Sequence, residues 1–306
     1  MASPYGRQHA SPARLVVQSL RPQQWTKNLF VFAGLGFSGR LLERGAWPPA
    51  VAAFLIFCGL SGAVYLINDV LDRSADAQHP LKRLRPVASG ALRPGIALGA
   101  AGVLGAVCLA GAAAVNRELA LTAIAYVLLL VAYSAALKHY VIIDVLTLSG
   151  GFVLRAVAGA VAIDVPISHW LLVCTTLLAL FLALSKRRHE LVLLADGAGS
   201  HRPILQEYSP YLLDQMIGVV TASTVVSYVI YTISPDTVQK FHTNYLGLTL
   251  VFPLYGIFRY LYLVHQKEGG GSPSDMLQND RPLLACCVLW AVSVAVIVYA
   301  AAGNTT

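Results

Sequence analysis

The sequence from Trp47 to Asp76 reads WPPAVAAFLIFCGLSGAVYLINDVLDRSAD, an apolar run that ends in a cluster of acidic residues. Its first 21 residues, Trp47 to Ile67, carry no charge. A bilayer core about 30 Å thick is crossed by an α-helix of about 20 apolar residues, so this run has the length of one crossing. Its last nine residues carry three carboxylates and one arginine. We therefore predict a membrane-spanning helix that becomes strongly charged where it leaves the bilayer.

Similar apolar blocks recur along the whole chain. Of its 306 residues, 57% are hydrophobic and 12% are charged, whereas about 25% are charged in soluble domains. The blocks lack the period-two alternation of a transmembrane β-barrel. We predict an all-α, polytopic membrane protein. Its nine predicted spans are Asn28 to Phe37, Trp47 to Ile67, Gly95 to Val115, Leu119 to Leu137, Val141 to Ile163, His169 to Ser185, Leu212 to Ile233, Tyr245 to Val264 and Leu283 to Ala302.

The basic residues predict how the chain is oriented. If the predicted spans alternate in direction, sixteen Lys and Arg fall on the side of the N-terminus and four on the other side. Short cytoplasmic loops carry the excess of Lys and Arg in membrane proteins, so we predict a cytoplasmic N-terminus in the cell membrane. The net charge of +7 then reflects topology, and we expect no nucleic-acid partner. We expect residues 1–20 to form a cytoplasmic segment and residues 21–306 a single transmembrane domain.

The acidic cluster predicts a metal site. On a helix, Asn68, Asp72 and Asp76 repeat every four residues, and Asp69 lies three residues before Asp72. Like charges at this spacing repel one another, and the loss of hydration near a membrane adds to that cost. Mg²⁺ prefers oxygen ligands and would remove both costs, so these four residues are the predicted metal ligands. The alternative is a solvated acidic helix end that binds nothing.

A basic stretch follows the acidic cluster within about ten positions. It contains Lys82, Arg83 and Arg85. Cations beside a metal are suited to a diphosphate, because the metal bridges phosphate oxygens while Lys and Arg neutralise the remaining charge. The alternative is that these are ordinary cytoplasmic loop charges.

The acidic cluster resembles a motif of the UbiA superfamily of intramembrane transferases, whose members carry N-D-x-x-D-x-x-x-D at a cytoplasmic helix end. Asn68, Asp69, Asp72 and Asp76 match every fixed position. The resemblance implies a bundle of nine transmembrane helices with an active-site cavity that faces the cytoplasm. Further segments resemble the branch of the superfamily that transfers phosphoribosyl groups to polyprenyl phosphates of the decaprenyl type. They are Arg21 to Asn28, Asn68 to Pro86, Leu137 to His139, Arg155 to Gly159, and Lys186 and Arg187 with Glu190.

One segment departs from the broader superfamily. Where prenyltransferases of the superfamily have a second aspartate-rich motif, this chain has three consecutive cations from Lys186 to Arg188. Cations suit a phosphate group that is not metal-bound, and phosphoribosyl pyrophosphate has one at its ribose 5-position. Glu190 and Asp196 leave open the alternative that this segment also binds a metal.

The resemblance implies that a 5-phosphoribosyl group passes from phosphoribosyl pyrophosphate to a polyprenyl phosphate, with Mg²⁺ as cofactor. Arg155 is an expensive charge within an apolar span, which favours a functional role. Tyr133 is a candidate substrate contact or an interfacial anchor. The alternatives are a prenyltransferase with a polyprenyl diphosphate donor, and a lipid or solute transporter. The oligomeric state stays open, a homo-oligomer included. The predicted roles are metal binding and catalysis for Asp69, Asp72 and Asp76 with Asn68, pyrophosphate binding for Lys82, Arg83 and Arg85, 5-phosphate binding for Lys186 and Arg187, and lipid-phosphate binding for Gln24, Lys27, Lys138 and Arg155.

Overall fold

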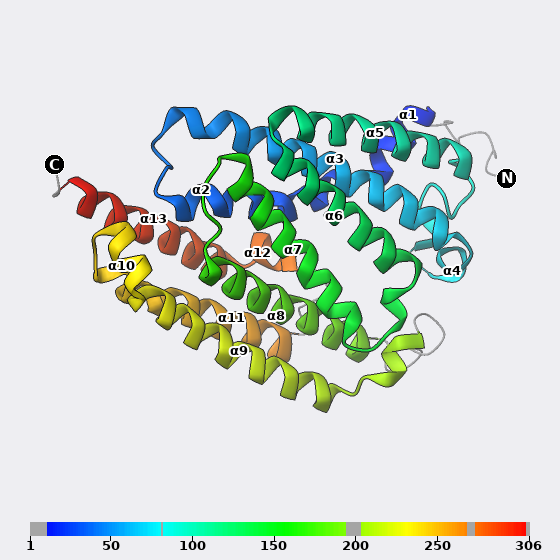
Figure 1. Cartoon of the computed structure of the whole chain (residues 1–306). Coiled ribbons are helices and arrows are strands. Elements are labelled where there is room, and N and C mark those ends of the chain that lie inside the picture. The colour runs from blue at the N-terminus through cyan, green and yellow to red at the C-terminus, as the bar shows by residue number, and fades with distance from the viewer. Residues whose placement is uncertain (1–10, 81, 194–202, 268–272, 304–306) are drawn as a thin grey trace.

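The chain is helical throughout the parts that the computed structural model describes, which are residues 11–80, 82–193, 203–267 and 273–303, and these parts contain no β-strand (Figure 1). The α-helices are α1 (Pro12–Ser19), α2 (Ala33–Ser38), α3 (Trp47–Leu71), α4 (Arg73–Gln78), α5 (Pro94–Val115), α6 (Arg117–Ala135), α7 (Ile143–Ala162), α8 (His169–Leu193), α9 (Pro210–Ile233), α10 (Pro235–Phe241), α11 (Val251–Gln266), α12 (Pro273–Asn279) and α13 (Arg281–Gly303). The 3-10 helices are η1 (Pro22–Phe32), η2 (Arg44–Ala46), η3 (Lys82–Leu84), η4 (Leu137–His139), η6 (Pro203–Glu207) and η7 (Tyr245–Leu250).

Eight helical segments of the described chain are long and apolar enough to cross a membrane. They coincide with the second to the ninth predicted spans. Many of their large apolar side chains are exposed, for example Val103 on α5, Leu128 on α6 and Val296 on α13. Such a surface is tolerated where it contacts lipid instead of water, and the chain is a multi-pass membrane protein.

The first predicted span differs from the other eight. It is not one long α-helix, because the 3-10 helix η1 runs directly into the short α2. A 3-10 helix rises about 2.0 Å per residue and an α-helix about 1.5 Å, so these two elements together extend about 31 Å. That length matches one crossing, although the ninth crossing itself stays a prediction.

Close backbone contacts hold η1 and α2 against α7. The Cβ of any larger residue at Gly159 on α7 would collide with the backbone carbonyl of Val31 on η1. In the same way, a Cβ at Gly34 on α2 would collide with the backbone of Ala160. Two glycines on facing helices therefore allow the backbones to approach each other, as small residues do at helix interfaces in membranes.

The long helices form two groups that meet at α7 and α8 (Figure 1). One core contains Phe57 of α3, Leu119 and Tyr126 of α6 and Val31 of η1. The second core contains Phe181 of α8 and further buried side chains of α9 and α11. Helix α7 contributes residues to both cores and packs against η1, α6 and α8. Side chains from both groups can therefore meet where α7 begins, next to the end of α8.

Candidate active site

The three predicted metal-binding carboxylates lie where α3 passes into α4. Asp72 separates these two helices, yet the helical spacing continues because its N–H donates to the carbonyl of Asn68 at 2.8 Å and its carbonyl accepts from the N–H of Asp76 at 2.8 Å. Asp69 and Asp76 are buried, whereas Asn68 and Asp72 are half-buried. The predicted acidic face is therefore present, and it points into the protein.

Cations from two other segments pair with the buried carboxylates. Arg21, between α1 and η1, forms an ion pair with Asp69. Arg85, which follows η3, bridges two carboxylates, with its Nη1 atom 2.5 Å from Asp76 and 3.4 Å from Asp69. The ammonium of Lys82 lies 4.0 Å from Asp76. Lys82 and Arg85 therefore lie beside the acidic cluster, whereas their role in pyrophosphate binding stays a prediction.

Arg21 joins this site although the sequence did not single it out as a site residue. It adopts a left-handed backbone conformation, with φ of 53°, which turns the chain between α1 and η1. Its guanidinium stacks over the ring of Tyr65, 4.7 Å from the ring centroid. Burial lowers the pKa of Arg21, while the carboxylate of Asp69 opposes that shift. An indication of its importance was that Arg21 begins the segment from Arg21 to Asn28, one of the segments that resemble the phosphoribosyl-transferring branch of the superfamily.

Asp72 has a cationic partner of its own. Lys138 on η4, between α6 and α7, forms an ion pair with Asp72. Four segments thus meet at one end of the long helices, namely the turn between α1 and η1, the junction of α3 and α4, the stretch from Lys82 to Arg85, and η4. The side chains that form this ionic cluster are Arg21, Asp69, Asp72, Asp76, Lys82, Arg85 and Lys138.

The oxygen donors of this cluster suit a hard divalent cation such as Mg²⁺. As the described side chains lie, however, no three His, Cys, Asp or Glu residues converge closely enough to hold a metal. Repulsion among the carboxylates is also offset by Arg21, Arg85 and Lys138, which form ion pairs with them. The donor chemistry fits a metal, and its binding would compete with these ion pairs.

A second cluster surrounds Arg187, near the end of α8. The guanidinium of Arg187 donates to Asp144 at 2.8 Å, to Glu190 at 2.6 Å and to the Tyr133 hydroxyl at 3.2 Å. The hydroxyl of Tyr208 donates to the other oxygen of Asp144 at 2.8 Å and accepts the Ile142 N–H at 2.7 Å. Burial raises the pKa of Tyr208 to about 12, so this hydroxyl keeps its proton at neutral pH.

We predicted that Arg187 binds the 5-phosphate, but these contacts favour a buried ion pair within the protein. Its side chain is 3% exposed and that of Asp144 is fully buried, so the cation is already neutralised inside the protein. Lys186 beside it is more exposed and lies 3.8 Å from Glu190. Asp144 and Tyr208 were not predicted as site residues. A carboxylate within the predicted span from Val141 to Ile163 was the available indication, because such residues seldom lack a function.

Arg155 lies in a third polar group, inside the membrane-spanning part of α7. It donates to the side-chain oxygen of Asn28 at 2.7 Å, to the Tyr126 hydroxyl at 2.6 Å and to the carbonyl of Gly151 at 2.9 Å. It is 5% exposed and forms no ion pair within the described chain. These contacts link η1, α6 and α7, whereas its predicted role in lipid-phosphate binding stays a prediction.

The remaining predicted residues include two on η1 and one beside Lys82. Gln24 and Lys27 are half-buried on η1, the element that follows Arg21. Arg83 is exposed, and its side chain makes no polar contact with described residues. Asp196 lies outside the described residues. The roles assigned to these residues stay predictions.

Long apolar helices and a charged site at one end of them define an integral membrane protein with chemistry at the membrane boundary. Residues 29–279 match the UbiA prenyltransferase family. The chain belongs to this family of intramembrane transferases, and the predicted fold class is confirmed.

Two relatives and one solved structure show the extent of this similarity. The chain is 32% identical to decaprenyl-phosphate phosphoribosyltransferase of Mycobacterium tuberculosis over 94% of its own length and 96% of the relative. It is 30% identical to the protein of the same name from Corynebacterium glutamicum, covering 93% of this chain and 86% of that one. The structure of a UbiA homolog from Archaeoglobus fulgidus bound to GPP and Mg²⁺ aligns with a TM-score of 0.70 at 18% identity, covering 93% of this chain and 99% of that one.

Proposed function

We propose that this enzyme transfers a 5-phosphoribosyl group from phosphoribosyl pyrophosphate to a polyprenyl phosphate of the decaprenyl type, releasing pyrophosphate. The names of the relatives with 30–32% identity support this choice of substrates. The observation that carries the proposal is the ionic cluster, in which carboxylates and cations from four segments meet at one end of the bundle. Such a mixture suits a diphosphate, which needs both a metal-binding face and direct cationic contacts.

The reaction breaks the bond between the anomeric carbon and the pyrophosphate oxygen, and it forms a bond between that carbon and an oxygen of the lipid phosphate. Negative charge develops on pyrophosphate as it leaves. Arg85 and Lys82 lie beside Asp76. In this proposal they stabilise that charge, as fixed cations do in other group transfers. The acceptor needs no general base, because a phosphomonoester with a second pKa of about 6 is already ionised at neutral pH.

Mg²⁺ is the cofactor in this proposal, with Asp69, Asp72 and Asp76 as ligands and Asn68 in support. When bound, it would neutralise diphosphate oxygens and make pyrophosphate a better leaving group. The solved structure of a family member with bound Mg²⁺ supports this choice. The cations that now pair with the carboxylates, Arg21 and Lys138 among them, would then become available to the substrate phosphates.

The other predicted contacts divide between the two substrates. Lys186, which is more exposed than Arg187, is the better candidate for the 5-phosphate. Lys27 and Gln24 on η1, with Lys138, are the proposed contacts of the lipid phosphate at the membrane boundary. The proposed orientation puts this end of the bundle in the cytoplasm, where the excess of Lys and Arg is expected.

Mass spectrometry of the lipid product tests the proposal directly. Purified protein is incubated with Mg²⁺, isotope-labelled phosphoribosyl pyrophosphate and decaprenyl phosphate, and Asp72→Asn serves as the inactive control. The expected product is a labelled phosphoribosyl lipid that forms with wild-type protein alone and disappears when the metal is chelated. Turnover of a polyprenyl diphosphate without any phosphoribosyl lipid would instead establish the prenyltransferase alternative. Lipid transport without chemical conversion would reject both enzymes.

A further inference from the structure

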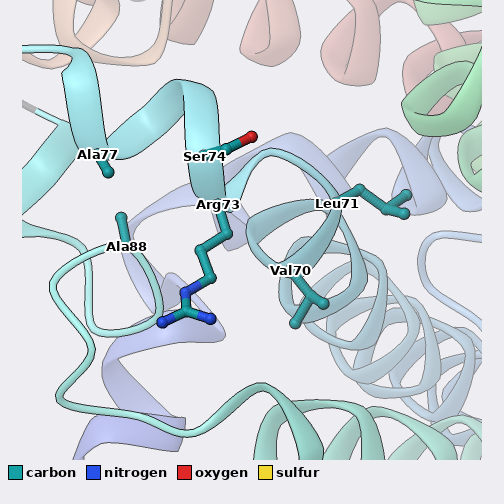
Figure 2. A pocket seen from close by; sticks show the side chains of 6 residues that line it. All are labelled: Val70, Leu71, Arg73, Ser74, Ala77 and Ala88. Carbon is teal, nitrogen blue, oxygen red and sulfur yellow. The ribbon is translucent and has the colours of Figure 1, made fainter.

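A small cavity lies beside the ionic cluster. It has a volume of about 380 Å³, within the range typical of small-molecule sites. It is formed where α3 passes into α4, together with the chain that follows η3 (Figure 2). None of the carboxylates of the ionic cluster lines it. The lining residues are Val70, Leu71, Arg73, Ser74, Ala77 and Ala88.

Arg73 is the charged side chain of this cavity. Figure 2 shows its guanidinium extending into the space between Val70 and Ala88. Within the described chain, Arg73 forms no ion pair and no side-chain hydrogen bond, although three carboxylates lie on the same short stretch. Those carboxylates are paired with Arg21, Arg85 and Lys138 instead. The guanidinium is therefore free to bind an anion.

The remainder of the cavity is mostly apolar, and its position places it at the membrane surface. Val70 and Leu71 are the last two residues of a membrane span, and Leu71 is half exposed. Leu84 on η3, which packs against α4, is also strongly exposed. An anion held there would have its charge on Arg73 and an apolar portion along Val70 and Leu71. That combination fits an amphipathic ligand better than a free phosphate ion.

We propose that this cavity binds the headgroup of an anionic phospholipid of the surrounding membrane. Basic pockets at the cytoplasmic surface of membrane proteins recognise such headgroups. A phosphodiester accepts charge-assisted hydrogen bonds from a guanidinium, while its acyl chains remain in the bilayer. The lipid contacts α4, the same short helix that carries Asp76, so its binding stabilises the position of this helix. This site is separate from the substrate site proposed above.

Native mass spectrometry of the purified full-length protein, titrated with phosphatidylglycerol or phosphatidylcholine, tests the assignment. The Arg73→Gln variant is expected to bind phosphatidylglycerol about tenfold more weakly than wild type, since one charge-assisted contact is lost. Arg93→Gln is the matched control, because Arg93 is an exposed arginine near the start of α5 that does not line the cavity. Its binding should stay within about twofold of wild type, and phosphatidylcholine should bind all three proteins equally.

A second variant fills the cavity without changing its charge. Ala88→Leu is expected to weaken phosphatidylglycerol binding to a similar extent, and it carries the test if Arg73→Gln does not fold. Equal phosphatidylglycerol binding by wild type and both cavity variants would overturn the proposal. Binding of decaprenyl phosphate in place of phosphatidylglycerol, with the same dependence on Arg73, would overturn the phospholipid assignment.

Discussion

Replacing Asp144 by alanine is expected to destabilise the folded protein strongly. The side chain of Asp144 is fully buried, and that of Arg187 is 3% exposed. Removal of the carboxylate leaves the Arg187 cation inside the protein with Glu190 as its remaining charged partner. The Tyr208 hydroxyl loses its acceptor at the same time. Three elements are affected together, because these residues lie on α7, α8 and the segment before α9.

The expected magnitude follows from burial. Removing one partner of a buried ion pair costs about 3–5 kcal/mol, and the retained Glu190 favours the lower end of that range. The lost hydrogen bond of Tyr208 adds about 1 kcal/mol, for a total of about 4 kcal/mol. Because a chain of this size loses about 2 °C in melting temperature per kcal/mol, the expected decrease is about 8 °C.

A double-mutant cycle separates a structural ion pair from a substrate contact. Arg187→Met alone is expected to destabilise the protein by a similar amount. The combined Asp144→Ala and Arg187→Met variant should lose about 2–3 kcal/mol less than the sum of the two, since no uncompensated charge remains at their contact. Thermal unfolding of detergent-purified protein, at one fixed scan rate, measures all three variants. Glu118→Ala, which changes an exposed carboxylate, is the control and should alter stability by less than about 1 kcal/mol.

Two results would refute this reasoning. The first is strict additivity of the two substitutions. The second is an Arg187→Met variant of unchanged stability whose KM for the phosphoribosyl donor is raised, because that pattern is expected of a cation that binds substrate and not of one that holds α8 to α7.

Three further predictions concern other parts of the molecule. Asp72→Ala should lower Mg²⁺-dependent turnover at least 100-fold while the protein remains membrane-inserted and monodisperse on gel filtration; near-normal turnover would exclude Asp72 as a ligand. Gly159→Ala should cost about 1–3 kcal/mol or more in thermal unfolding, whereas Gly105→Ala, which meets open space on α5, should not destabilise. The hydrogen bond from Arg259 lowers the pKa of Asp280. The ion pair between Arg259 and Asp280 therefore contributes fully to stability at neutral pH, and this contribution is lost as the pH falls through the lowered pKa of Asp280. In the Asp280→Asn variant, the melting temperature should change less between pH 5 and about pH 3 than it does in wild type.

The membrane spans were predictable because their signal is local. A run such as Trp47 to Ile67 must be buried in lipid whatever its neighbours are, and length alone then sets one crossing. The 3-10 helix η1 was not predictable in this way. Its geometry depends on the close approach of its backbone to Gly159 and on the hydrogen bond between Asn28 and Arg155, and both partners lie more than 120 residues away.

In the candidate site, too, local features were predictable and long-range contacts were not. The spacing of Asp69, Asp72 and Asp76 follows from helix geometry, so their shared face was predictable. The ion pairs between distant parts of the chain were not predictable. In the sequence, the charges near Arg187 resemble a basic loop, and only the fold brings Asp144, at the start of α7, beside Arg187. Charge patterns along a sequence show where ionisable groups are concentrated, but only packing determines which of them neutralise one another.

The charge balance of the ionic cluster bears on the order in which ligands bind. Three carboxylates face four cations, since Arg21, Lys82, Arg85 and Lys138 all contact them, so the cluster is slightly positive without any ligand. A divalent cation alone would add to that positive charge and displace existing ion pairs. A diphosphate alone would meet the carboxylates, which repel it. The two together cancel most of each other's charge, because the metal takes the carboxylates while the released cations take the phosphates. The arrangement therefore favours joint binding of metal and donor over separate binding of either.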